Sequence, residues 1–261
     1  MASETSLLKD EDGRAFGSCT FLFVLTTLPA LLVLAACGSS KKTTGQSVVT
    51  ACVLPDDQAN SLQGHWSSPP IKIAFHAGEF SAGEKGMIQS AVSTWNTFFS
   101  ISKGLAIFEV SAAESPVNQT GPTCVGSTIP DGIVLYKRGS SWTRSASAVA
   151  LTTFCTTSAQ GGIPKMYNAI MEFNYRDFFN GAKNPDLESI AVHELGHLLG
   201  LDHSCGPLRS NAANVACPGP GSGNFLLSTV MFPTVFFDSG GNGEVKRALH
   251  ENDQGRANCL Y

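Results

Sequence analysis

Charged residues are scarce in this 261-residue sequence: only 15% are Asp, Glu, Lys or Arg, and the formal net charge is -4. The chain therefore lacks the basic excess with which nucleic-acid-binding proteins contact phosphates, and its pI near 5.8 agrees. No internal repeat and no sign of a second domain is visible in the sequence. We accordingly expect no nucleic-acid partner and one folded domain.

Glycine and proline are plentiful instead, with 26 and 13 residues, and 43% of the chain is hydrophobic. This composition favours a loop-rich globular domain over a helical bundle. About 200 residues remain once an N-terminal targeting segment is set aside, which is enough for one sizeable core or two lobes that share a cleft.

The N-terminal region carries an export signal. From Phe21 to Ala36 the chain has no charge, and this apolar run ends in small residues before Cys37. The sequence Leu-Ala-Ala-Cys at 34–37 resembles the lipobox of bacterial lipoproteins, in which the cysteine becomes the lipidated N-terminus. We therefore expect a lipoprotein signal peptide at 1–37, a flexible polar tether at 38–68 and a folded domain at 69–261.

Two observations keep other targeting modes open. The segment before the apolar run is acidic, with Glu4, Asp10, Glu11 and Asp12 against Lys9 and Arg14, whereas signals favour positive charge there. The uncharged stretch at 15–36 is also just long enough for an uncleaved membrane anchor. An anchor or plain secretion are thus alternatives to a lipoprotein that faces the periplasm or cell surface, and all three export the domain.

Six cysteines lie outside the signal and the lipobox, an even number that suggests disulfides in an exported chain. Six cysteines allow 15 connectivities. The short loop between Cys205 and Cys217 makes that pair the best candidate. For the others we expect Cys124–Cys155 and Cys52–Cys259.

The hydrophobic pattern predicts an α+β fold. A strand is expected over 70–76, and Ser81 with Glu84 predicts a capping box that opens a helix with an apolar face. Further strands are expected at 105–110, 132–137, 147–155 and 168–174. Asn184 and Pro185 predict the start of a second helix that ends near Gly200, and a short closing helix is expected near 251–260.

A group of histidines follows inside that second helix. His193 and His197 are four residues apart and so face the same side, where both imidazoles can bind one metal ion. Gly200 allows the sharp turn that brings His203 back as a third ligand. Glu194 can then reach a water on the metal without being a ligand itself.

Three imidazoles leave one coordination position open, as in catalytic zinc sites. Zinc lowers the pKa of its water towards about 7 and polarises a bound carbonyl. Glu194 can take the proton of the attacking water as general base and return it to the leaving amine. The residues therefore predict one catalytic zinc ion and hydrolytic chemistry.

The extended motif from His193 to His203 resembles that of the metzincin metalloproteases. These enzymes also have a methionine-containing turn below the zinc, and Met231, followed by Pro233, is similar to it. Ser204 after the third histidine and the closing stretch at 247–261 favour the matrixin branch. The resemblance covers roughly residues 70–261.

The resemblance implies a metzincin catalytic domain: a twisted five-stranded mixed sheet, two long helices, and a small irregular C-terminal subdomain with a closing helix. It further implies a zinc-dependent endopeptidase that holds extended substrate along an edge strand at 148–153. Ala150 and Leu151 of that strand, with Pro233 and Val235 after the methionine, would bind substrate, and Phe236 and Phe237 would narrow the pocket.

The sequence departs from matrixins in two respects. No cysteine-switch propeptide is visible, and the segment at 138–147, where animal matrixins bind a second zinc, has no His or Asp. We expect a single Zn²⁺, while Ca²⁺ stays possible but unassigned. The expected partners are polypeptide substrates and, through Cys37, a membrane; the protein is expected to be a monomer. The alternative function is that of a non-hydrolytic, zinc-binding adhesin or scaffold lipoprotein.

Overall fold

The computed structural model describes residues 47–122, 124, 132–157, 162–206 and 214–261. These residues fall within one compact unit that extends to the C-terminus. The predicted signal peptide and Cys37 lie outside the described residues. No helix in the described ranges combines the length and apolar character that a membrane span requires.

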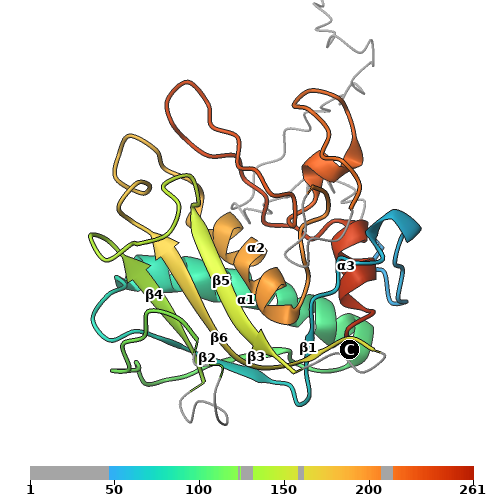
Figure 1. Ribbon diagram of the computed structural model, residues 1–261, viewed down its shortest axis with the longest axis horizontal. Coiled ribbons are helices and arrows are strands. Elements are labelled where there is room, and N and C mark those ends of the chain that lie inside the picture. The colour runs from blue at the N-terminus through green and yellow to red at the C-terminus, as the bar shows by residue number, and fades with distance from the viewer. Residues whose placement is uncertain (1–46, 123, 125–131, 158–161, 207–213) are drawn as a thin grey trace, which may run out of the picture. The chain divides into compact units, whose positions relative to one another are not determined.

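The centre of the domain is a mixed β-sheet (Figure 1). Neighbouring strands follow the order β1-β6-β4-β2-β3 and are all parallel, whereas β5 is antiparallel to β6. The five predicted strands are confirmed, and a two-residue strand, β1, adds to them. The strands are β1 (His65–Trp66), β2 (Ile71–Phe75), β3 (Phe108–Val110), β4 (Ile133–Arg138), β5 (Ala150–Thr156) and β6 (Lys165–Asn174).

The first long helix, α1 (Ala82–Lys103), begins at the predicted capping box. The Ser81 amide donates to the Glu84 carboxylate at 2.7 Å, and the Glu84 amide donates to the Ser81 hydroxyl at 3.3 Å. Gly104 ends the helix in the left-handed conformation, with φ 71°. The predicted apolar face is buried and includes Trp95, which is 0% exposed.

The second helix, α2 (Leu187–Leu199), begins slightly later than predicted. Asp186 is its N-cap, because its carboxylate accepts a hydrogen bond from the Ser189 amide at 2.9 Å. Asn184 is therefore not the cap, and Pro185 precedes the cap instead of lying in the first helical turn. Gly200 ends the helix as predicted, with φ 114°.

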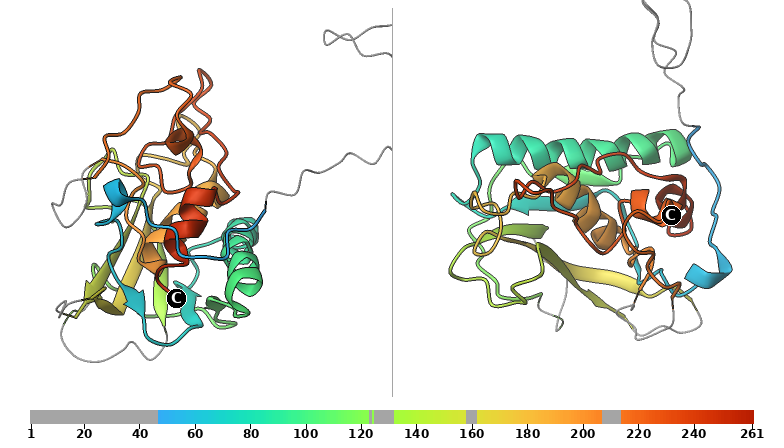
Figure 2. Two further views of the ribbon diagram at one scale, coloured as in Figure 1. Left: turned by 90° about the vertical axis from the view of Figure 1, so that its right-hand side faces the viewer. Right: turned by 90° about the horizontal axis from the view of Figure 1, so that it is seen from above.

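Both long helices pack on one face of the sheet and enclose the main hydrophobic core with it (Figures 1 and 2). The indole nitrogen of Trp95 on α1 donates to the carbonyl of Val192 on α2 at 2.9 Å, so the large side chain also satisfies a buried polar group. This contact fixes α2, which carries two of the predicted metal ligands, relative to α1.

Residues 47–68 differ from the expected flexible tether because they pack against the domain. Cys52 forms a disulfide with Cys259, and the Val53 amide donates to the Gly255 carbonyl at 3.1 Å. The side chain of Gln58 is buried and donates to the Ser204 carbonyl at 2.8 Å. The folded domain thus begins before residue 69, since a disulfide and hydrogen bonds attach this segment to Ser204, Gly255 and Cys259.

The described residues after Leu201, at 202–206 and 214–261, form the expected irregular subdomain. It contains the 3-10 helix η2 (Phe225–Ser228), a separate small core of Cys205, Leu226 and Phe232, and the closing helix α3 (Glu251–Ala257). The Cys205–Cys217 disulfide crosslinks this subdomain, whose own core is small. All three predicted disulfides are present: Cys52–Cys259, Cys124–Cys155 and Cys205–Cys217.

Candidate active site

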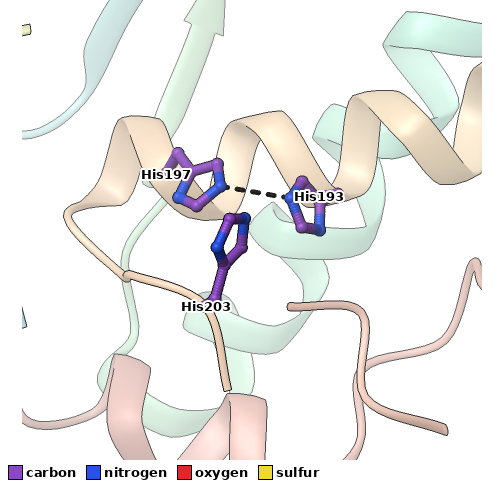
Figure 3. Close-up of side chains that lie close together, drawn as sticks. All are labelled: His193, His197 and His203. Carbon is purple, nitrogen blue, oxygen red and sulfur yellow. Dashed lines mark hydrogen bonds between the residues drawn. The ribbon is translucent and has the colours of Figure 1, made fainter. Parts of the chain in front are cut away.

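The three predicted metal ligands converge beside α2 (Figure 3). His193 and His197 project from successive turns of the helix, and the turn at Gly200 returns the chain so that His203 faces them. One potential ligand atom from each imidazole lies within 4.8 Å of the others. In the described residues this is the one group of His, Cys, Asp or Glu side chains with such spacing.

The hydrogen bonds of two imidazoles suit them to metal binding. Nδ1 of His193 lies 2.6 Å from the Val230 carbonyl, and Nδ1 of His197 lies 2.8 Å from the Leu201 carbonyl. Because a carbonyl only accepts, Nδ1 is the donor in each neutral imidazole, and this tautomer leaves the Nε2 lone pair available to a metal. The two Nε2 atoms are 3.1 Å apart. Zn–N bonds of about 2.1 Å in a tetrahedral site would place two ligand nitrogens about 3.4 Å apart, so the residues fit a zinc ion.

Met231, the methionine of the predicted turn, packs against α2 at Gly196. Its side chain is 0% exposed, and a Cβ atom placed on Gly196 would lie 2.3 Å from its sulfur. The buried carboxylate of Asp253 on α3 accepts hydrogen bonds from the amides of Val230 and Met231, at 3.0 and 3.2 Å. The closing helix α3 therefore holds the segment at Val230 and Met231 in place, and the Val230 carbonyl orients His193.

Glu194 lies beside the histidines with its side chain almost completely buried, at 4% exposure. Its carboxylate lines the same cavity as the three imidazoles. The hydroxyl of Thr152 on β5 donates to Glu194 Oε2 at 2.7 Å. Thr152 falls within the predicted edge strand, but nothing in the sequence connects it with Glu194.

A cavity of about 500 Å³ extends from the histidines along α2. One side is formed by residues 147–151, at the start of β5, which is an edge strand because it pairs with β6 alone among the described strands. The opposite wall is the chain after Met231. All four residues predicted to bind substrate line this cavity: Ala150, Leu151, Pro233 and Val235.

Of the two phenylalanines that were predicted to narrow the pocket, one lines it and the other does not. Phe237 lines the cavity, whereas Phe236 packs against Phe232 and the small core of the subdomain. The pocket also contains an ion pair that was not predicted from the sequence. Lys246 Nζ lies 2.9 Å from Glu244 Oε1, and both residues line the cavity. Neither residue belongs to a motif, so only the fold could place them here.

The segment at 138–147 contributes arginines where animal matrixins bind a second zinc. Arg138 Nε donates to Glu172 Oε1 at 2.8 Å, and Arg144 lies 3.3 Å from the other oxygen of the same carboxylate. Glu172 is buried on β6, and strand alternation places it on the face opposite Met171 and Phe173, which pack in the core with the helices. Guanidinium groups thus attach this loop to the sheet.

The described residues combine a mixed sheet, three converging histidines, an adjacent buried glutamate and a buried methionine against α2. A family model described as Matrixin matches residues 109–209, which include β4 to β6, α2 and the three histidines. No curated protein matches the chain. The Matrixin match and the three-histidine cluster support a matrixin-like metzincin, and the fold is of the mixed α/β kind.

Proposed function

We propose that this protein is a zinc-dependent endopeptidase that cleaves extended polypeptide segments, with Glu194 as general base. The observation that carries the proposal is the buried carboxylate of Glu194 beside three converging imidazoles, in a cavity bordered by an edge strand. The matrixin match supports the same class of activity.

His193, His197 and His203 would hold the ion. Zinc bound there would supply Lewis-acid chemistry, polarising the scissile carbonyl and activating a water for attack. Glu194 would accept a proton at a carboxylate oxygen as the water attacks and deliver it to the nitrogen of the leaving amine. The free edge of β5 would bind the substrate backbone by strand addition, while the cavity between Leu151 and Val235 accepts a side chain.

The variant Glu194→Ala tests this proposal. We expect it to retain one zinc per chain while cleavage of an unfolded protein substrate falls by about 10²- to 10⁴-fold, since general bases contribute this much. Glu109→Ala is a matched control because Glu109 is exposed on β3 and does not line the cavity. Cleavage by Glu194→Ala at the rate of the parent protein would contradict the mechanism.

The same assay addresses the alternative of a non-hydrolytic adhesin or scaffold. Metal binding alone needs only the three histidines, so such a protein has no use for a buried carboxylate at Glu194. A parent protein that binds zinc but cleaves no peptide in a complex mixture would favour the alternative.

We further propose that the domain is exported and attached to a membrane by lipid at Cys37. The apolar segment at 21–36 supports this, and so do three disulfides, which persist in oxidising compartments. Cys37→Ser should move the protein from the membrane fraction to the soluble fraction of fractionated cells. Unchanged partitioning would favour an uncleaved anchor.

A further inference from the structure

We propose that Thr152 is a positioning residue that holds the Glu194 carboxylate in its working orientation. The inference rests on the proposed function, since it assigns a role to Thr152 through the general base. It concerns the hydroxyl of Thr152 on β5 and the carboxylate of Glu194 on α2. These residues are 42 positions apart in the sequence, and the two elements pack against each other (Figure 1).

Strand geometry directs Thr152 towards the helix. Successive side chains of a strand point to opposite faces, so Thr152 faces α2, whereas its neighbour Leu151 lines the substrate cavity. Thr152 is 0% exposed, and it pairs with Met171 of the central strand β6. Its hydroxyl is therefore fixed by a buried β-branched side chain on a well-supported strand.

The Thr152 hydroxyl has one proton to donate, and two oxygens of Glu194 lie within hydrogen-bond distance of it. The Thr152 oxygen lies 2.7 Å from Glu194 Oε2 and 3.2 Å from the Glu194 main-chain oxygen. The shorter bond goes to the carboxylate, as expected for a charged acceptor. Among the residues that the structure describes, Thr152 is the one side chain that donates a hydrogen bond to this carboxylate.

The two carboxylate oxygens of Glu194 therefore have different roles. Oε2 is occupied by the hydroxyl, so the other oxygen is free to accept a proton in the cavity. Because Glu194 is nearly buried, water cannot readily replace a lost hydroxyl as the donor. Without Thr152 the carboxylate would rotate more freely, and a misplaced catalytic group costs up to about 100-fold in rate.

Two substitutions separate the hydroxyl from the shape of the side chain. Thr152→Val keeps the volume and the β-branch but removes the donor, whereas Thr152→Ser keeps the donor and removes a methyl group. Thr156→Val is the matched control, since it makes the same change on the same strand at an exposed position outside the cavity lining. Zinc content and thermal unfolding of the purified variants show whether each is folded and loaded.

Peptide cleavage is the first readout. We expect Thr152→Val to lower kcat by about 10- to 100-fold with KM nearly unchanged, because the base is displaced while the substrate-binding surface stays intact. Thr152→Ser should stay within about threefold of the parent protein, since the donor remains. A purely structural role would instead make Thr152→Ser, which leaves a cavity, at least as damaging as Thr152→Val.

The second readout needs neither zinc nor activity. Denaturant unfolding of the chelator-treated protein is measured for Thr152→Val, Glu194→Ala and the double variant, with the disulfides intact. A double-mutant cycle should give a coupling of about tenfold in the unfolding constant, as expected for a buried hydrogen bond to a charged group.

The outcomes are distinct. Parental kcat in Thr152→Val, equal losses in the Val and Ser variants, or additive effects in the cycle would each overturn the role of Thr152. If the zinc-loaded parent protein cleaves nothing, the proposed function fails, and a positive cycle would then show a hydrogen bond without a catalytic role.

Discussion

The substitution Gly200→Ala tests how the domain brings His203 to the other two histidines. Gly200 has φ 114°, where an L-residue is strained, and a Cβ atom there would lie 1.8 Å from the carbonyl oxygen of Gly64. The backbone of the N-terminal segment therefore occupies the space that any side chain at position 200 would need. Either the turn or the N-terminal segment must move.

The expected loss of stability can be worked out from the contacts. The left-handed conformation costs a residue with a Cβ about 1–2 kcal/mol. Displacing the segment also breaks two hydrogen bonds, from the Gln63 amide to the Gly200 carbonyl at 2.7 Å and from the Asp202 amide to the Ser61 carbonyl at 2.8 Å. At about 1 kcal/mol each, these bring the total to about 3–4 kcal/mol, a large part of the usual 5–15 kcal/mol of a domain.

The metal site should weaken as well. The Leu201 carbonyl orients His197, and His203 follows two residues later, so a shifted turn disturbs two ligands. Loss of such an outer-shell partner typically lowers metal affinity by about 10- to 100-fold. We expect both a lower denaturation midpoint and weaker zinc binding, measured by urea unfolding and competition with a chromogenic chelator.

Gly86→Ala provides the matched control. Gly86 lies within α1 with nothing within 4 Å of an added Cβ, so the same change there should stabilise the protein by about 0.5–1 kcal/mol. The reasoning would be refuted if Gly200→Ala unfolded within about 1 kcal/mol of the parent protein and bound zinc equally well.

Two further predictions concern the surroundings of the site. Glu172→Gln should destabilise the domain by about 3 kcal/mol in urea unfolding, because it leaves the buried Arg138 without its charge partner. The control Glu188→Gln should cost less than about 1 kcal/mol, since its partner Arg247 is 44% exposed. Equal losses in the two variants would contradict this prediction. Burial raises the pKa of Glu84, but hydrogen bonds from Lys137, Tyr175 and Ser81 outweigh it and lower this pKa from 4.5 to about 2. Glu84 thus stabilises the fold above pH 4.5 and loses this contribution as the pH falls towards 2, so Glu84→Gln should flatten the acid side of the stability profile, and an unchanged profile would contradict the assignment.

Local patterns in the sequence predicted most of the secondary structure. The capping box at Ser81 and the helix end at Gly200 depend on residues only a few positions apart, and such short-range chemistry is visible in sequence. The error at the start of α2 is of the same kind, because Asn184 and Asp186 are both good caps and only their geometry selects Asp186.

The packing of residues 47–68 could not be predicted in this way. The small polar residues that favoured a tether lie at 38–45, whereas the segment at 47–68 is attached to distant residues of the domain such as Ser204, Gly255 and Cys259. The composition of a segment indicates only how much apolar surface the segment can bury by itself. It does not indicate contacts with residues about 200 positions away, even though Cys52–Cys259 was among the expected disulfides.

The three histidines and Glu194 can be predicted from the sequence, because the pitch of a helix places His193 and His197 on one face with Glu194 beside them, and a glycine at position 200 allows the chain to turn back to His203. The tertiary structure alone decided what surrounds them: the Thr152 hydroxyl on Glu194, the Val230 carbonyl on His193, Met231 below Gly196, and the Lys246–Glu244 pair in the pocket. These contacts join elements far apart in the chain, and their distances depend on how the sheet, the helices and the irregular subdomain pack together.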